Sequence, residues 1–193
     1  MSNNTSAAEL RHVALNQFAT VGFAGTSLAQ IAVAAGLSKS SVLYHNASKE
    51  ALLEAAIGPA VDRIERLVDD VPAPSADPAE RDRFVEDFIG FLLECRLEVH
   101  TFINQWQSLG GMPVIDRANA AVERLARKVT DDLPSSADRV RFGVALGGAA
   151  YILAAGGNWG HDPAPPEEMR AALIVVVSEL LAANAPTPDA LHR

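Results

Sequence analysis

Apolar residues recur at helical spacing along almost the whole chain, and no stretch alternates apolar and polar residues in the way that a half-buried strand does. Near the N-terminus, Leu10, Ala14, Phe18 and Val21 follow one another at intervals of three or four residues. Gly22 comes directly after them and is a natural end for a helix. The sequence therefore predicts an all-α protein with about nine helices and no sheet.

Charge is unevenly distributed along the chain. The 193 residues include 16 lysines and arginines against 24 aspartates and glutamates, which gives a formal net charge of −8. This balance excludes a generally basic protein that coats nucleic acid, but not a compact basic patch. Residues 1–49 contain Arg11, Lys39 and Lys49 against the single acidic residue Glu9, so the N-terminal part is the basic end.

Cysteine usage and hydropathy favour a cytoplasmic protein. A single cysteine, Cys95, excludes an intramolecular disulfide. The first residues lack the basic start and apolar core of a signal peptide, so none is expected. Residues 142–160 carry no charge, but six are glycine and five are alanine. We therefore expect a closely packed helix there rather than a membrane span.

A proline-rich segment, residues 71–78, is expected to separate the N-terminal helices from a long helical pattern. That pattern begins near Glu80 and carries an apolar, largely aromatic stripe at intervals of three or four residues. The stripe consists of Phe84, Phe88, Phe91, Cys95, Val99, Phe102 and Trp106. A bend is expected near His100. Further helices are expected over about 114–132, 136–155 and 166–184.

A helix, a glycine-containing turn and a short helix are expected in the basic N-terminal part. Ser27 and Gln30 have the spacing of a capping box at the start of the first helix, and Gly36 can end it. Ser38 can cap the short helix, expected over about 39–45, and Ser48 can cap the next helix, expected over about 49–69. This order is that of a helix-turn-helix, whose second helix enters the major groove of DNA.

Three stretches of this part follow one another in a diagnostic order. They are Phe18-x-x-x-Gly22-Phe23-x-x-Thr26-Ser27, Ile31-Ala32-x-x-Ala35-Gly36-Leu37-Ser38-Lys39 and Leu43-Tyr44-His45-x-x-Ser48-Lys49-Glu50-Ala51-Leu52-Leu53. Together, over about residues 10–57, they resemble the N-terminal signature of the tetracycline-repressor (TetR) family. The resemblance implies a homodimeric transcription regulator, usually a repressor, that binds a pseudo-palindromic operator in double-stranded DNA and a small-molecule effector.

The family's organisation implies two domains. Residues 1–48 would form the helix-turn-helix DNA-binding domain of three helices, and residues 49–193 a helical effector-binding and dimerisation domain. The DNA-binding residues expected from this resemblance are Thr26, Ser27, Ser38, Lys39, Ser40, Ser41, Tyr44, His45 and Lys49. A cation at the start of a helix opposes the helix dipole, so Lys49 suggests a phosphate partner.

The C-terminal part would hold the effector pocket, because ligand pockets are mostly apolar with a few polar groups. The expected pocket residues are Phe88, Phe91, Cys95, Val99, Phe102 and Trp106, with His100 and Gln105 as polar groups. As an alternative, the stripe forms plain core.

A dimer interface is expected from the last two long helices. Glycine and alanine over 143–150 permit close helix approach, and the apolar run at 173–177 is too broad for one buried stripe. The residues expected in the interface are Gly143, Gly147, Ala150, Leu173, Val176 and Leu180.

Asn46 departs from the family pattern, which usually has Phe at this position. That Phe commonly packs the recognition helix against the helix that follows it. We therefore expect Asn46 to loosen this joint, unless its amide makes a polar contact there.

The alternative function is a helical small-molecule-binding or scaffold protein that has lost specific DNA binding. Asn46 and the small number of cations favour it, and the salt dependence of DNA binding would distinguish the two. An enzyme is not expected, because the sequence has no glycine-rich phosphate loop, nucleophile elbow or paired carboxylate motif. The five histidines lack metal-ligand spacing, and no metal or cofactor is expected.

Overall fold

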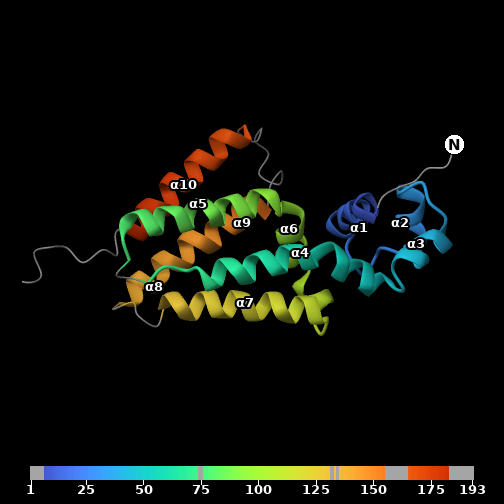
Figure 1. Cartoon of the computed structure of the whole chain (residues 1–193), viewed down its shortest axis with the longest axis horizontal. Coiled ribbons are helices and arrows are strands. Elements are labelled where there is room, and N and C mark those ends of the chain that lie inside the picture. The colour runs from blue at the N-terminus through green and yellow to red at the C-terminus, as the bar shows by residue number, and fades with distance from the viewer. Residues whose placement is uncertain (1–6, 74–75, 131–132, 134, 155–164, 183–193) are drawn as a thin grey trace, which may run out of the picture. The chain divides into compact units, whose positions relative to one another are not determined.

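The computed structural model describes residues 7–73, 76–130, 133, 135–154 and 165–182 (Figure 1). Over these ranges the chain is all-helical and has no strand, as the sequence predicts. The elements are α1 (Ala7–Val21), α2 (Leu28–Ala34), α3 (Lys39–His45), α4 (Lys49–Asp69), α5 (Pro78–Glu94), α6 (Arg96–Leu109), α7 (Pro113–Thr130), α8 (Ser136–Phe142), η1 (Gly143–Gly147), α9 (Gly148–Ala154) and α10 (Pro166–Ala182).

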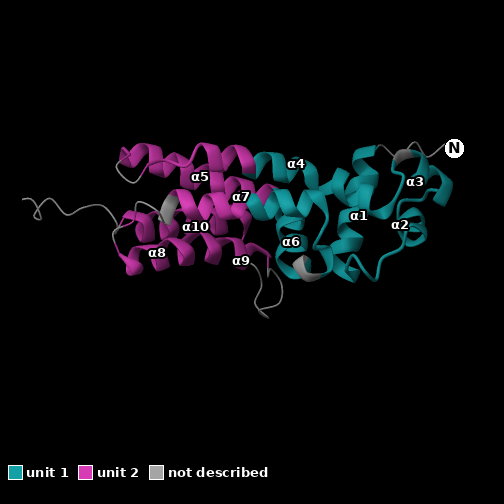
Figure 2. Cartoon of the chain, turned by 90° about the horizontal axis from the view of Figure 1, so that it is seen from below, with its two compact units in different colours: residues 1–64, 95–120 teal, residues 65–94, 121–193 magenta. Residues whose placement is uncertain are grey.

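The chain divides into two compact units (Figure 2). Unit 1 comprises Met1–Ile64 and Cys95–Ala120, and unit 2 comprises Glu65–Glu94 and Ala121–Arg193. Helices α4 and α7 contribute residues to both units. The unit boundaries differ from the functional division expected after residue 48, because α6 and the first part of α7 pack within unit 1.

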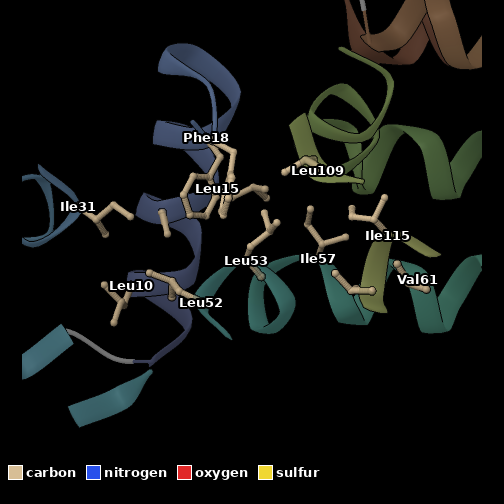
Figure 3. Packing of buried hydrophobic residues seen from close by; sticks show 14 of the residues in the cluster. Leu10, Leu15, Phe18, Ile31, Leu52, Leu53, Ile57, Val61, Leu109 and Ile115 are labelled. Atoms are coloured by element: carbon tan, nitrogen blue, oxygen red, sulfur yellow. The ribbon is translucent and has the colours of Figure 1, made fainter. Parts of the chain in front are cut away.

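Unit 1 has one continuous hydrophobic core. Leu10, Leu15 and Phe18 of α1 point toward Leu52 and Leu53 of α4 (Figure 3). The short helices α2 and α3 contribute the buried side chains of Ile31, Ala32 and Val42 to this core. The region of α6 and α7 contributes those of Leu109, Val114, Ile115 and Ala118. The core thus joins the three N-terminal helices to segments about 90 residues away in the sequence.

Unit 2 is built around α5 and α10. Helix α10 packs on α5, α8 and η1, and α9 also packs on α5. On α5, Phe84 and Phe88 stack with ring centroids 6.1 Å apart, and Phe91 is buried as well. Leu173 and Val177 of α10 are buried too. The N-terminal half of the aromatic stripe is therefore core in unit 2.

Two glycines end helices as predicted. Gly22 follows α1 with φ +91° and donates to the Phe18 carbonyl, and Gly36 follows α2 with φ +65°. Both conformations are left-handed, where a Cβ atom is unfavourable. Beyond Gly36, the Leu37 N–H donates to the Ala32 carbonyl at 2.8 Å, which turns the chain toward α3.

The predicted helix starts are confirmed. Ser27 and Gln30 form the capping box, in which the Gln30 side chain accepts from the Ser27 N–H at 2.7 Å. Ser38 caps α3 by accepting from the Ser41 N–H at 3.1 Å. The predicted bounds of α3 and α4 agree with the structure.

The long helical pattern breaks earlier than predicted. The bend expected near His100 lies instead at Cys95, whose φ of −103° and ψ of 32° interrupt the helix between α5 and α6. No glycine or proline marks this position. The helix expected over 136–155 contains a wider π turn, η1, between α8 and α9.

No helix among the described residues is long and apolar enough to cross a membrane. Residues 155–160 of the uncharged run lie outside the described residues.

Glu98 of α6 occupies a half-buried position in unit 1. Burial raises the pKa of its carboxyl above the ordinary value, since desolvation outweighs the main-chain hydrogen bond and the charge of His12, which both lower the pKa. The native state therefore holds this proton more tightly than the unfolded chain does. Its contribution to stability is fully present below the ordinary glutamate pKa and is lost as the pH rises through the raised value.

We therefore expect Glu98→Gln to increase the free energy of unfolding at neutral pH and to leave it unchanged at acid pH. Chemical denaturation between about pH 4 and pH 8 measures both. Glu86→Gln, which removes an exposed carboxylate from α5, is the control and should give the same small difference at every pH. A Glu98→Gln curve parallel to that of the wild type would contradict the expectation.

Candidate nucleic-acid interface

Helices α2 and α3 pack against each other and form the helix-turn-helix that the sequence predicts. Each has seven residues. Ile31, Ala32 and Val42 face the core of unit 1, with exposed fractions of 2% or less. The burial of these three side chains decides which face of the helix pair is left for solvent.

The solvent-exposed residues of α3 combine polar groups with Leu43 and the aromatic Tyr44. Lys39 and Ser40 are exposed, and Tyr44 is 88% exposed. Ser41 is half-buried, and its hydroxyl lies 2.8 Å from that of the capping residue Ser38. Hydroxyls, an ammonium group and a phenol can bond both phosphate oxygens and base edges. The side chain of His45 lies outside the described part of the chain.

Thr26 and Ser27 have different positions, although both are expected to contact DNA. Thr26 is 3% exposed, and its hydroxyl lies 2.7 Å from the Gly22 carbonyl oxygen and 3.2 Å from that of Gln17. This hydroxyl therefore stabilises the fold through contacts within the chain. Ser27 is exposed and caps α2.

Lys49 lies at the start of α4, where its ammonium group contacts other residues of the chain. Its Nζ donates to the carbonyl oxygens of Phe23 at 2.7 Å and Thr26 at 3.0 Å. Nζ also lies 4.2 Å from the centre of the Phe23 ring, a cation–π geometry. The phosphate contact expected for Lys49 would have to share the ammonium group with these partners.

The neighbouring Glu50 favours the start of α4. Hydrogen bonds from its own main-chain N–H and from Ser48 hold the pKa of its carboxyl below the ordinary value. The anion lies in the first turn, where the helix dipole stabilises negative charge.

Asn46 ends α3 in an extended conformation and is half-buried. Its N–H donates to the Val42 carbonyl at 2.9 Å. The expected loosening of the joint with α4 stays a prediction.

The expected effector-pocket residues are divided between the two units. Phe88 and Phe91 are buried in unit 2, whereas Phe102 is partly buried against the core of unit 1. Cys95 lies at the helix break and Val99 is half-buried in α6. The side chain of Trp106 lies outside the described residues.

The two polar pocket candidates are both engaged with main-chain or neighbouring groups. His100 Nδ1 lies 3.2 Å from the Asn104 side-chain nitrogen. Gln105 Oε1 accepts from the Phe23 N–H at 2.6 Å, and its Nε2 donates to the Phe18 carbonyl. The sequence gives no signal for the contacts of Gln105 with Phe18 and Phe23, or for those of Lys49 with Phe23 and Thr26. Each of them joins residues more than 20 positions apart.

The expected dimer residues lie on helices of unit 2 that carry exposed apolar side chains. Gly143, Gly147 and Val176 are exposed, Ala150 and Leu180 are half-buried, and Leu173 is buried. The large apolar side chains exposed on the same helices are Val140, Val144, Tyr151, Ile152 and Val175. A Cβ added at Gly143 or Gly147 would meet no atom within 4 Å.

Comparison with known families gives one match, to the model described as bacterial regulatory proteins, tetR family, over residues 10–56. No curated protein matches the chain. The matched residues include α2, α3 and most of α1.

Solved structures share the fold over most of the chain. A TetR-family regulator from Streptomyces coelicolor is 22% identical, with 89% of each chain covered and a TM-score of 0.66. The ketosteroid transcriptional regulator KstR2 of Mycobacterium tuberculosis is 19% identical, with 92% of this chain and 93% of that chain covered and a TM-score of 0.66. AibR, solved with isovaleryl coenzyme A and operator DNA, is 21% identical, with 88% and 96% covered and a TM-score of 0.59. The chain therefore carries the N-terminal segment of the tetR family of bacterial regulatory proteins and has the fold of that family's solved members.

Proposed function

We propose that this protein is a homodimeric, ligand-responsive transcription regulator of the cytoplasm, a repressor that a small molecule releases from its operator. The observation that carries the proposal is the α2–α3 pair within the family-matched segment. Ile31, Ala32 and Val42 of the pair are buried, and its exposed residues include Lys39, Ser40 and Tyr44. This is the distribution that a helix entering the major groove requires.

The proposed division of labour has residues 1–48 reading DNA and residues 49–193 binding the effector and the second subunit. The effector would be bound within the second of these parts, and an apolar effector would suit its aromatic and aliphatic side chains. AibR was solved with an acyl coenzyme A, and KstR2 is a ketosteroid regulator. Acyl thioesters and steroids are therefore reasonable first compounds to test.

Helix α4 is the proposed link between the two parts, because it begins next to α3 and runs for 21 residues. Its middle contains Gly58 and Pro59. Pro59 has no N–H to donate to the carbonyl of Ala55, so a bend costs less there than elsewhere in the helix. Effector binding at residues beyond Pro59 could in this way change the direction of the first half of α4.

The thermodynamic linkage between effector binding and operator binding determines how strongly the effector can release the operator. Moving the equilibrium between DNA-binding and released forms from 99:1 to 1:99 requires about 5.5 kcal/mol of differential effector binding. The operator must then weaken effector binding by the same factor as the effector weakens operator binding. Equal effector affinity with and without operator would rule out this mechanism.

The proposed occupant of the apolar face on α8, α9 and α10 is a second copy of this chain. Six large apolar side chains exposed on α8, η1, α9 and α10 are more than scattered surface residues explain. The open glycines 143 and 147 leave room for a partner helix. Two subunits are also what a pair of half-sites about one helical turn apart requires.

We expect the purified protein to recover a two-fold symmetric site from a pool of random DNA duplexes at near-physiological salt without added effector. Binding to that site should weaken steeply with salt, since displaced counterions return to the phosphates. The test uses folded protein whose dimeric state has been measured by sedimentation. If such protein recovers no site, the alternative of a helical ligand-binding protein without specific DNA binding is favoured.

The two lysines of the helix-turn-helix region should have separable effects. Lys49→Met leaves the Phe23 and Thr26 carbonyl oxygens without their charged donor, so the free energy of unfolding should fall by about 1–3 kcal/mol. Lys39→Met should leave stability within about 0.5 kcal/mol of the wild type. It should weaken operator binding and reduce the salt slope by about 1 per subunit. Denaturant unfolding and a salt titration of operator binding measure these quantities. A reduction of the salt slope by about 1 per subunit in Lys49→Met would instead assign a phosphate to Lys49.

The dimer face can be tested with a matched pair of substitutions. Val176 on α10 and Val122 on α7 are similarly exposed, at 51% and 47%. We expect Val176→Glu to shift the protein to monomers, because two carboxylates would be buried near the symmetry axis. Val122→Glu should remain dimeric in the same sedimentation experiment. Dimers of equal stability in both variants would exclude α10 from the interface.

A further inference from the structure

The connection between α1 and α2, residues 22–27, is held by a side chain from a distant helix. Gln105 of α6 accepts a hydrogen bond from the Phe23 N–H at 2.6 Å. Its Nε2 donates to the Phe18 carbonyl. One amide group therefore bonds the last turn of α1 and the first residue after Gly22, with more than 80 residues between the partners.

The chemistry of this contact is specific to glutamine. Its amide offers a donor and an acceptor at the end of a two-carbon side chain, whereas a carboxylate offers acceptors only. Phe18 lies in the last turn of α1, and its carbonyl oxygen accepts hydrogen bonds from both the Gly22 N–H and the Gln105 amide. A glutamate at position 105 would place negative charge against the Phe18 carbonyl oxygen and lose the donor.

Further contacts restrain the α1–α2 connection in addition to the hydrogen bonds of Gln105. The Nζ atom of Lys49 donates to two carbonyl oxygens of this connection, those of Phe23 and Thr26. The rings of Phe18 and Phe23 lie 5.2 Å apart, and Phe23 is 5% exposed. Helix α2 begins at Leu28, five residues after Phe23, and α3 packs on α2. A displacement of Phe23 therefore moves the start of the helix pair that is proposed to bind DNA.

We propose that Gln105 is a positioning residue for DNA binding. Its amide sets where α2 begins, and through α2 it sets the direction in which α3 is presented. The position of α6 is in this way transmitted to the helix-turn-helix through main-chain hydrogen bonds of Phe18 and Phe23. The inference rests on the proposed function and adds to it a specific residue outside the DNA-facing surface.

The test compares Gln105→Met, which keeps the length of the side chain and removes both hydrogen bonds, with Asn104→Leu. Asn104 is the adjacent amide on α6, is exposed and donates to the His100 carbonyl of its own helix. We expect Gln105→Met to weaken binding to the selected operator at least tenfold at a temperature where the variant is fully folded. Asn104→Leu should bind as the wild type does. Binding to a scrambled duplex should be unchanged in both variants.

Amide spectra provide a second measurement that does not depend on the operator. In Gln105→Met the Phe23 N–H should exchange faster with solvent, and the α2 amide resonances, such as that of Ile31, should shift. A purely structural role would lower the melting temperature and leave the operator affinity of the folded protein and the α2 resonances unchanged.

The outcomes distinguish the two proposals. Wild-type operator affinity in Gln105→Met, or unshifted α2 resonances, would overturn the role of Gln105. If the wild type itself selects no operator, the proposed function fails, and the amide spectra alone decide whether Gln105 positions α2.

Discussion

Helices of seven residues are unstable on their own in water, because the cost of starting a helix is not recovered over two turns. Both helices of the helix-turn-helix in this chain, α2 and α3, have that length. Their stability comes from burial, since Ile31, Ala32 and Val42 enter the same core as α1 and α4 (Figure 3). The proposed DNA-binding surface is therefore fixed by a core that is mostly made by other helices.

The same dependence holds for polar groups. The main chain between α1 and α2 lies against a buried phenylalanine pair, so its carbonyl and N–H groups need partners within the protein. Lys49 and Gln105 supply them from two distant helices, and Thr26 supplies one from within the connection. Unit 1 therefore joins its parts by hydrophobic contacts and by hydrogen bonds to one short connection.

Local features of the sequence predict much of this fold. Ser27, Ser38 and the glycines at 22 and 36 determine helix ends through interactions with residues a few positions away, which is why the bounds of α3 and α4 could be predicted. The apolar stripe of the long helical pattern continues through Cys95 without interruption, so the break there leaves no trace in the spacing. The π turn at η1 also leaves no trace in the spacing of the residues.

The candidate site is predicted less completely. The exposed residues of α3 follow from the family resemblance and from helical geometry. The roles of Lys49 and Gln105 depend on which distant segments meet, and a single sequence does not contain that information. For Lys49, the unfavourable position at a helix start suggested a phosphate partner. The structure shows instead that its ammonium group donates to carbonyl oxygens of the chain itself, and the phosphate contact stays a prediction.

Lys49 and Gln105 both bind main-chain atoms, which every amino acid possesses. Apart from Gly22, Phe23, Thr26 and Ser27, which have the structural roles described above, the residues between α1 and α2 can therefore change during evolution without disturbing these contacts. Substitutions in that segment could alter the surface near DNA while its path is preserved. Under the proposed function, new operator preferences would then arise while the fold of unit 1 is kept.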